Sequence, residues 1–229
     1  MNNKIKIATF NIWKNDGEFP NRIFKLNNEL KSNNFDIICL QEDYESEEFS
    51  SSKYLNKSLE FNYISTKTRR KVRNNQLSSS NLTILSKYEI KLIDEIFFNK
   101  NEKEERACQI IEVNIKDKKI LLVNTHLSHI SEQERISQIK KILQYLKKYN
   151  KLYNITMFCG DLNALPNSKE IALIKENAFR DENIQFSHKD GVTIDYIFYK
   201  SDEKIKVHSK IVLKDYSDHY CLVSTFNFK

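Results

Sequence analysis

The stretch ITMFCGDLNALPNS, residues 155–168, decides the fold. It begins with an unbroken apolar run, which is typical of a strand buried on both faces. The run stops at Gly160, and Asp161 and Asn163 then place a carboxylate and an amide where the strand ends. A helical pattern follows over 168–177. The stretch therefore predicts a buried strand over 155–160 that brings polar side chains to one edge of a sheet.

Polar side chains also stand at the ends of other apolar runs. Each one alone has a structural explanation, because Asp, Asn and Gly punctuate turns and a lone His is usually a satisfied polar group. Their recurrence in six segments favours a shared site instead. Besides the stretch above, the segments contain Asn11, Gln41-Glu42, Asn124-Thr125-His126, Asp195 and Ser217-Asp218-His219.

Hydrophobic periodicity predicts an α/β protein in which strands dominate. Runs such as FDIICLQE and ILLVNTH are apolar on both faces, so their strands should be central and covered on both sides. We therefore expect stacked sheets flanked by helices. Ser131 and Glu134 form a capping-box pattern at the start of the clearest helix. The predicted strands are 4–11, 35–42, 61–66, 81–86, 89–97, 107–115, 119–126, 155–160, 193–199, 204–213 and 221–228, and the predicted helices are 20–32, 46–59, 131–149 and 168–177.

Composition limits the class of protein. With 229 residues, 40% of them hydrophobic, and only three Gly and two Pro, the chain suits a packed core and excludes collagen-like or disordered classes. No linker interrupts it, so we expect a single domain over 1–229.

The chain contains no apolar run of the roughly 18 residues that a spanning helix needs, and no secretory segment, which predicts a cytoplasmic protein without membrane contact. The four cysteines lie far apart in apolar runs, which indicates buried free thiols.

The charge is modestly basic, because 37 Lys and Arg against 31 Asp and Glu give 37 − 31 = +6. The conspicuous basic run is KTRRKVR, residues 67–73, between two predicted strands. We interpret it as a basic loop. Such a loop is either a solvated face or a surface that tracks phosphate groups, and the run itself leaves both alternatives open.

The polar residues at the strand ends favour one kind of chemistry. Carboxylates with amide oxygens suit a hard cation, and Mg²⁺ takes one or two protein carboxylates while keeping waters and a substrate phosphate. The Cys and His spacing does not suit zinc. Asn and His beside such a cation can stabilise phosphate oxygens as charge builds in the transition state. These residue types therefore point to phosphoester hydrolysis.

The same segments, in the same order, resemble the endonuclease/exonuclease/phosphatase superfamily with the DNase I-like fold. The matching motifs extend over almost the whole chain and read TFNIW, CLQED, LTILSKYEI, VNTHLSH, FCGDLNALPNS, VTIDYIFYK and YSDHYCLVSTF. The resemblance implies a four-layer α-β-β-α sandwich with two central mixed sheets. It also implies Mg²⁺ as cofactor, with Mn²⁺ able to substitute.

The resemblance further implies roles for individual residues. Glu42 would bind the metal, Asn11 would help to place metal or phosphate, and Asp218 would complete the metal site or orient its neighbour. Asp161 would orient and deprotonate the attacking water, and Asn163 would hydrogen-bond the phosphate.

Two histidines receive roles in the same way. His219 would donate to a phosphoryl oxygen, and His126 would stabilise the phosphate or assist the leaving group. Asp195 would hold an imidazole, and either His126 or His219 can be its partner.

Details of the sequence indicate the branch of the superfamily. The helix with Glu134, Arg135 and Gln138 resembles small bacterial metal-dependent hydrolases and tyrosyl-DNA phosphodiesterases. Arg106 lies where those relatives often have an Arg, and its alternative is a surface salt bridge. Thr193 stands where abasic-site endonucleases usually have Arg, which argues against abasic-site repair.

The leading functional hypothesis is a magnesium-dependent phosphodiesterase for nucleic acid or a nucleotide-like ester, with no obligate protein partner evident. The rivals are hydrolysis of a small phosphorylated metabolite or lipid head group, and a binding protein that keeps the fold without turnover. The expected substrate-binding residues are Arg106, Arg69, Arg70 and Arg73. Three aromatic residues can stack on bases or simply pack in the fold: Tyr149, Phe186 and Tyr216.

Overall fold

The computed structural model describes residues 4–73, 75–98, 105–149, 152–183 and 185–228. Its elements follow one another as β1 (Lys4–Asn11), α1 (Asn21–Ser32), β2 (Ile37–Glu45), α2 (Ser51–Asn56), β3 (Asn62–Thr66), β4 (Lys71–Arg73), β5 (Gln76–Ser86), β6 (Ile90–Phe97), β7 (Ala107–Ile115), β8 (Lys118–His126), α3 (Glu132–Leu146), the 3-10 helix η2 (Lys147–Tyr149), β9 (Ile155–Asp161), α4 (Lys169–Glu176), β10 (Asp195–Ser201), β11 (Lys206–Val212) and β12 (Cys221–Asn227).

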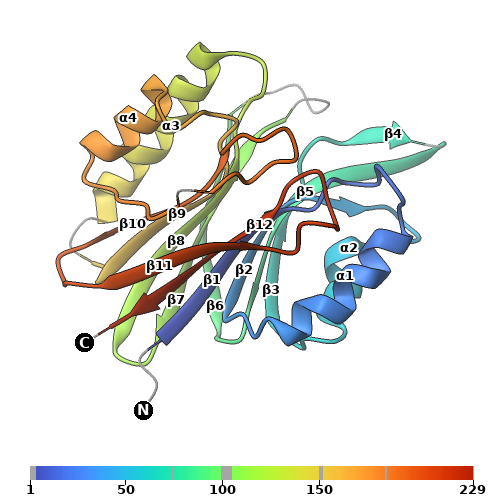
Figure 1. Ribbon diagram of the computed structural model, residues 1–229. Helices are drawn as coiled ribbons and strands as arrows, with labels where there is room; N and C mark the ends of the chain where they lie inside the picture. Colours follow the sequence, from blue (N-terminus) through green and yellow to red (C-terminus); the bar gives the residue numbers. More distant parts are fainter. Residues whose placement is uncertain (1–3, 74, 99–104, 150–151, 184, 229) are drawn as a thin grey trace.

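Two sheets lie face to face between two layers of helices (Figure 1). The larger sheet has the order β11-β12-β1-β2-β5-β3 with β4 paired to β5, and the smaller has the order β10-β9-β8-β7-β6. Both are mixed, because β1–β2 and β8–β9 are parallel pairs within otherwise antiparallel sheets. Helices α1 and α2 cover the larger sheet, and α3 and α4 cover the smaller one. The predicted four-layer sandwich is confirmed.

Strands that are apolar on both faces fill two layers of the core at once. Along β2, Ile37 and Cys39 point between the sheets, while Ile38 and Leu40 pack toward α1 and α2. All four side chains are fully buried. Side chains alternate across a strand, so an unbroken apolar run is what a strand in an inner layer requires. All four cysteines are buried free thiols, as expected.

The topology collects the polar strand ends at one edge of the sandwich. The parallel pairs end together, with Asn11 opposite Gln41 and His126 opposite Asp161. The antiparallel neighbour β10 begins at Asp195, which is also opposite Asp161. Three adjacent strands of the smaller sheet therefore bring His126, Asp161 and Asp195 side by side.

The basic run is not simply a loop, which corrects that prediction. Its last three residues form β4, and the partner strand β5 starts at Gln76, five residues before the predicted start at Asn81. The extra residues, QLSSS, are polar apart from the exposed Leu77, and they lack the apolar alternation that marks a half-buried strand. Pairing with β2 and β4, rather than apolar burial, fixes them as a strand.

The helix expected over 46–59 is also shorter than predicted. Glu45 pairs with Ser50 in an isolated bridge, which keeps the chain extended before the helix. The Ser50 side chain then accepts from the Lys53 backbone N–H at 3.4 Å and caps α2. Among the described residues, the structure contains no helix with the length and apolar character needed to cross a bilayer.

Candidate active site

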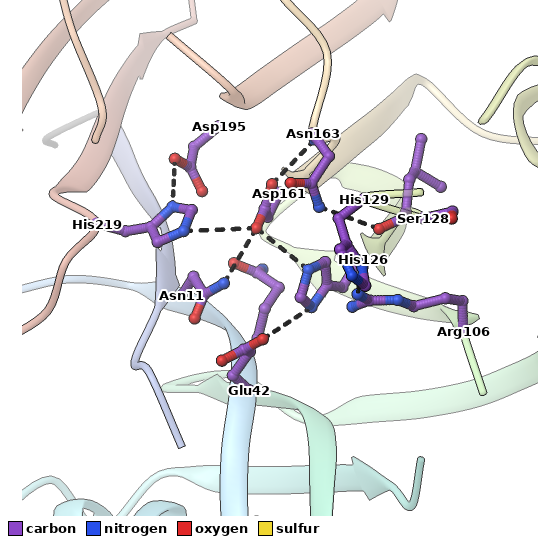
Figure 2. A network of polar contacts seen from close by, with 12 residues as sticks. Asn11, Glu42, Arg106, His126, Ser128, His129, Asp161, Asn163, Asp195 and His219 are labelled. Atoms are coloured by element: carbon purple, nitrogen blue, oxygen red, sulfur yellow. Dashed lines mark hydrogen bonds and ion pairs between the residues drawn. The ribbon is translucent and has the colours of Figure 1, made fainter. Parts of the chain in front are cut away.

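Asp161 is the centre of the polar cluster at the sheet edge (Figure 2). Its Oδ2 accepts from Asn11 Nδ2 at 3.0 Å and lies 3.2 Å from His126 Nε2 and 3.6 Å from His219 Nε2. Its Oδ1 accepts from the Asn163 backbone N–H at 2.9 Å. Residues from both sheets thus meet at one buried carboxylate, as the sequence predicted for Asn11, His126, Asp161, Asn163 and His219.

Gly160 permits this convergence because β8 and β9 approach closely beside it. Its φ is +143°, and a Cβ at this position would lie 1.9 Å from the carbonyl oxygen of Thr125. Only glycine fits such a position without displacing backbone. The glycine before Asp161 therefore holds the β8 and β9 strand ends, and with them His126 and Asp161, in register.

Asp195 is the partner of His219, which settles the alternative that the sequence left open. Its Oδ2 lies 2.9 Å from His219 Nδ1, and the carboxylate is fully buried. Burial alone would lower the pKa of His219, but the charges of Asp195 and Asp161 outweigh it and raise that pKa to about 10. His219 is therefore held as the cation, with Nε2 directed toward Asp161.

His126 has the opposite electrostatic setting. Burial lowers its pKa well below the ordinary value, and the positive charges of Arg106 and Arg69 lower it further. A neutral imidazole next to an imidazolium gives the site one hydrogen-bonding ring without charge and one proton donor. Pairs of titratable groups pushed apart in this way mark acid–base assignments in active sites.

Glu42 lies at a distortion of β2. The register with β5 shifts between Leu40 and Asp43, and Glu42 has a left-handed φ of +53°. Its carboxylate pairs with Arg69 Nη1 at 3.1 Å and Lys14 Nζ at 3.2 Å, and Oε1 is 3.9 Å from His126 Nδ1. Strained backbone of this kind persists where the surroundings over-determine it, and it clusters at functional sites.

Two basic residues that support this region were not predicted from the sequence. Lys14, which contacts Glu42, follows the TFNIW motif in a loop. Arg22 is buried beneath that loop and donates to the carbonyl oxygens of Ile12, Trp13 and Lys14 at 2.6, 2.5 and 2.7 Å. Burial lowers the pKa of Arg22 to about 10. Its burial could not be predicted from the sequence, because an Arg on a helix is usually solvated.

Asp218 has neighbours different from those of Glu42. Ser217 donates to its Oδ1 at 3.2 Å, and its Oδ2 lies 3.8 Å from His188 Nε2. The His188 ring packs edge-on against His219, with centroids 4.7 Å apart. His188 was not singled out by the sequence analysis. Asp218 therefore contacts His188, which in turn packs against His219.

The donor set fits a hard cation. Glu42 and Asp161 provide carboxylate oxygens beside the Asn11 amide, and oxygen ligands of this type suit Mg²⁺. Two groups of described side chains also have possible ligand atoms within 4.8 Å of one another, namely Asp161, Asp195 and His219, and His188, Asp218 and His219. The cysteines, which softer metals would favour, are buried in the core.

The predicted substrate-binding arginines have different surroundings. Arg106 is buried rather than at the surface, and its Nη2 lies 2.9 Å from His129 Nδ1. Arg69 contacts Glu42 at the site, whereas Arg70 is exposed. The side chain of Arg73 lies outside the part of the chain that the structure describes.

The three aromatic candidates also separate. Tyr149 packs on Tyr145 with ring centroids 5.4 Å apart, and Tyr216 packs against the core beneath α1 and α2. Both therefore have packing roles. Phe186 is 63% exposed and remains available for contact with a ligand.

Comparison with known proteins places this geometry in a family. The model of the Endonuclease/Exonuclease/phosphatase family matches residues 8–219. None of the curated proteins compared with the chain matches its sequence significantly. Similar solved structures share the fold at low sequence identity.

Three of these structures illustrate the likeness. An endonuclease/exonuclease/phosphatase family protein from Leptotrichia buccalis is 18% identical with a TM-score of 0.80, covering 98% of this chain and 100% of that one. The mannosyl-6-phosphatase of Bacteroides thetaiotaomicron is 15% identical, with a TM-score of 0.74 and coverage of 98% and 100%. TDP2 from Caenorhabditis elegans is 19% identical, with a TM-score of 0.71 and coverage of 98% and 74%. Because the family model spans most of the chain and includes every residue of the cluster around Asp161, the chain belongs to the endonuclease/exonuclease/phosphatase family.

Proposed function

We propose that the protein is a magnesium-dependent hydrolase of phosphodiester bonds in nucleic acid or a nucleotide-like ester. The observation that carries the proposal is the arrangement around Asp161, where a buried carboxylate lies between a charged His219 and a neutral His126. Such a site can accept a proton from water on one group and donate a hydrogen bond to a phosphoryl oxygen from another.

Asp161 is the group that accepts the proton of the attacking water. Burial raises its pKa, the cation of His219 opposes this, and the charge of Asp195 raises it again, so that the pKa stays above its ordinary value. A raised pKa makes a carboxylate a stronger base. The bond from the Asn163 backbone and the bond from Asn11 fix both oxygens of Asp161 in direction.

His219 and His126 act on the phosphate. Asp195 holds His219 at Nδ1, so the proton on Nε2 can be shared with a phosphoryl oxygen. Neutral His126 can donate from one ring nitrogen without adding charge. Asn163 lies beside Asp161, and its Nδ2 donates to the Leu127 carbonyl at 3.1 Å.

Glu42, with Asn11 beside it, would hold the metal. When bound, Mg²⁺ would neutralise charge on the phosphate oxygens and lower the pKa of the attacking water. Lys14 and Arg69 pair with Glu42 at 3.2 and 3.1 Å. With the metal on Glu42, these two cations would contact phosphate oxygens, and exposed Arg70 lies next in the chain.

A second candidate function is hydrolysis of a small phosphorylated metabolite or lipid head group. The likeness to a mannosyl-6-phosphatase over nearly the whole of both chains favours keeping it. The two functions share the phosphate site and differ in the group that is esterified to the phosphate.

A panel of substrates separates these functions. Plasmid, single-stranded DNA, 5′-tyrosyl DNA, and small monoesters and diesters are each incubated with Mg²⁺, Mn²⁺ or chelator. The proposal expects cleavage of nucleic acid or nucleotide diesters with either metal, none with chelator, and a rate that falls steeply with salt. Activity confined to small monoesters, with no dependence on salt, would favour the second function. A binding protein without turnover would give no product from any substrate.

A further inference from the structure

A cavity of about 540 Å³ opens beside the active site, and its volume falls within the range of small-molecule sites. Among the described residues, its walls include Phe186, His188, Lys189, Lys214 and Tyr220. None of the residues assigned to the reaction above lines it. The cavity is therefore a separate feature that the proposed chemistry leaves unexplained.

The cavity is joined to the active site through His188. The ring of His188 lines the cavity and packs edge-on against His219 at 4.7 Å. Backbone hydrogen bonds fasten the two walls, from Lys189 N to the Asp218 carbonyl at 2.9 Å and from Tyr220 N to the Ser187 carbonyl at 2.6 Å. The cavity is therefore separated from His219 by a single ring, that of His188, so a group attached to the reacting phosphate would meet the cavity one side chain away from the site.

The charge of the cavity is positive. Lys189 Nζ lies 5.0 Å from the centroid of the Trp13 ring, and Lys214 Nζ lies 5.6 Å from that of Tyr220. Neither amine forms an ion pair with a carboxylate of the described part of the chain. The cavity that contains Lys53 and Lys67 differs, because both pair with Glu45 at 3.3 and 3.4 Å. Of the described residues that line these two cavities, only those beside His219 thus include two amines that are not paired with a carboxylate.

Phe186 provides an apolar platform on the same wall. Its ring is 63% exposed, although its neighbours in the chain are anchored. The Gln185 carbonyl accepts from the Thr193 hydroxyl at 2.9 Å, and the buried Ser187 hydroxyl accepts from the Asp195 backbone N–H at 3.0 Å. A fixed, exposed aromatic ring binds a planar group with little loss of conformational entropy.

We propose that this cavity binds a nucleotide unit of the substrate next to the bond that is cleaved. The base stacks on Phe186, and a phosphate of that unit, distinct from the reacting one, lies near Lys189 and Lys214. This inference rests on the proposed function and narrows it to esters of nucleotides that have a second phosphate. A sugar phosphate or a simple lipid head group has no planar base and would leave Phe186 uncovered.

Binding to the Asp161→Asn variant with chelator tests the cavity without requiring turnover. Three ligands are compared by calorimetry: a dinucleotide with a terminal phosphate, the same compound without that phosphate, and the same compound with tetrahydrofuran in place of the bases. In this background Phe186→Ala should weaken binding of the phosphorylated dinucleotide on the order of tenfold. The same change should not alter the affinity for the ligand without bases. Phe186→Tyr should retain the affinity for the phosphorylated dinucleotide.

The lysines are tested with the same ligands. Lys189→Gln with Lys214→Gln should remove the preference for the terminal phosphate, whereas Lys53→Gln with Lys67→Gln, the matched pair in the other cavity, should not. Equal losses for ligands with and without bases, or an unchanged phosphate preference, would overturn the inference. Hydrolysis of methyl p-nitrophenyl phosphate by the wild-type protein reports on the proposed function separately, so the two failures are distinguishable.

Discussion

His219 Nδ1 lies 2.9 Å from Asp195 Oδ2, and Nε2 of the same ring lies 3.6 Å from Asp161 Oδ2. One imidazole thus connects a carboxylate that is fully buried with the carboxylate at the centre of the site. The pairing fixes which ring nitrogen faces the reaction. It also explains why this histidine keeps its proton when His126, at the end of β8, loses it.

Replacing Asp195 by Asn should return His219 to the behaviour of an ordinary buried histidine. Asp195 is the largest influence that raises the pKa of His219 to about 10, and without it the desolvation that lowers the pKa dominates. Imidazole ¹⁵N NMR of the metal-free protein should show His219 protonated at pH 8 in the wild type and neutral in Asp195→Asn. An unchanged titration in the variant would contradict the pairing.

Replacing Arg69 by Gln should strengthen binding of Mn²⁺. Arg69 pairs with Glu42 at 3.1 Å, so removing it leaves more negative charge for a metal ion. We expect tighter binding by several-fold, measured by EPR titration of free Mn²⁺. Arg70→Gln, an exposed neighbour, is the matched control and should change little. Weaker binding in Arg69→Gln alone would mean that Arg69 supports the metal site rather than competing for Glu42.

The raised pKa of Asp43 should make the stability of the protein depend on pH. It is buried and accepts from Ser52 N at 2.9 Å and from the Thr83 hydroxyl at 2.6 Å, yet burial raises its pKa from 3.8 to about 6. The folded chain thus binds this proton more tightly than the unfolded chain, so stability falls as pH rises from about 4 to about 6. Asp43→Asn removes the charge, so its free energy of unfolding should rise relative to that of the wild type as pH increases. The difference between variant and wild type should be more favourable to the variant by about 3 kcal/mol at pH 8 than at pH 3.

Urea unfolding at a series of pH values measures this difference. Glu45→Gln is a control of opposite sign, because hydrogen bonds and charges from Asn81, Lys53 and Lys67 outweigh burial and lower the pKa of Glu45. Its contribution to stability is present at high pH and is lost as pH falls, so Glu45→Gln should lose stability relative to the wild type as pH rises. A pH-independent difference for Asp43→Asn would show that folding does not raise the pKa of this carboxylate.

Gly160→Ala should destabilise the protein strongly. The new Cβ would meet the Thr125 carbonyl oxygen at 1.9 Å, so the backbone of β8 or β9 must move. We expect a loss of at least about 3 kcal/mol in the free energy of unfolding. Gly191→Ala is the matched control: its φ is +75° but no atom lies within 4 Å of the new Cβ, so it should lose only about 1 kcal/mol. Similar losses in both variants would contradict the role of the close strand approach.

Much of the fold and of the site could be predicted, because both depend on local pattern. Apolar runs on both faces identified the inner strands, and the polar residues that end them identified Glu42, His126 and Asp161. The pattern could not show β4 and the start of β5, since polar residues there are held by strand pairing rather than by apolar burial.

Residues that act through long-range contacts were harder to predict. Lys14 meets Glu42, and His188 meets His219, only after distant segments come together. The capping-box pattern at Ser131 was half correct: the Ser131 side chain caps α3 through the Glu134 backbone N–H, but the Glu134 carboxylate accepts from Ser128 instead. No periodicity within one segment encodes such partners.

The most direct test of the central claim is the turnover of Asp161→Asn on methyl p-nitrophenyl phosphate with Mg²⁺. Asp161 is the proposed base, and an amide at this position cannot accept the proton. We expect the wild type to hydrolyse the diester only with metal, and Asp161→Asn to lose about 10²-fold or more in kcat with an unchanged circular dichroism spectrum. Near wild-type turnover by the folded variant would contradict it.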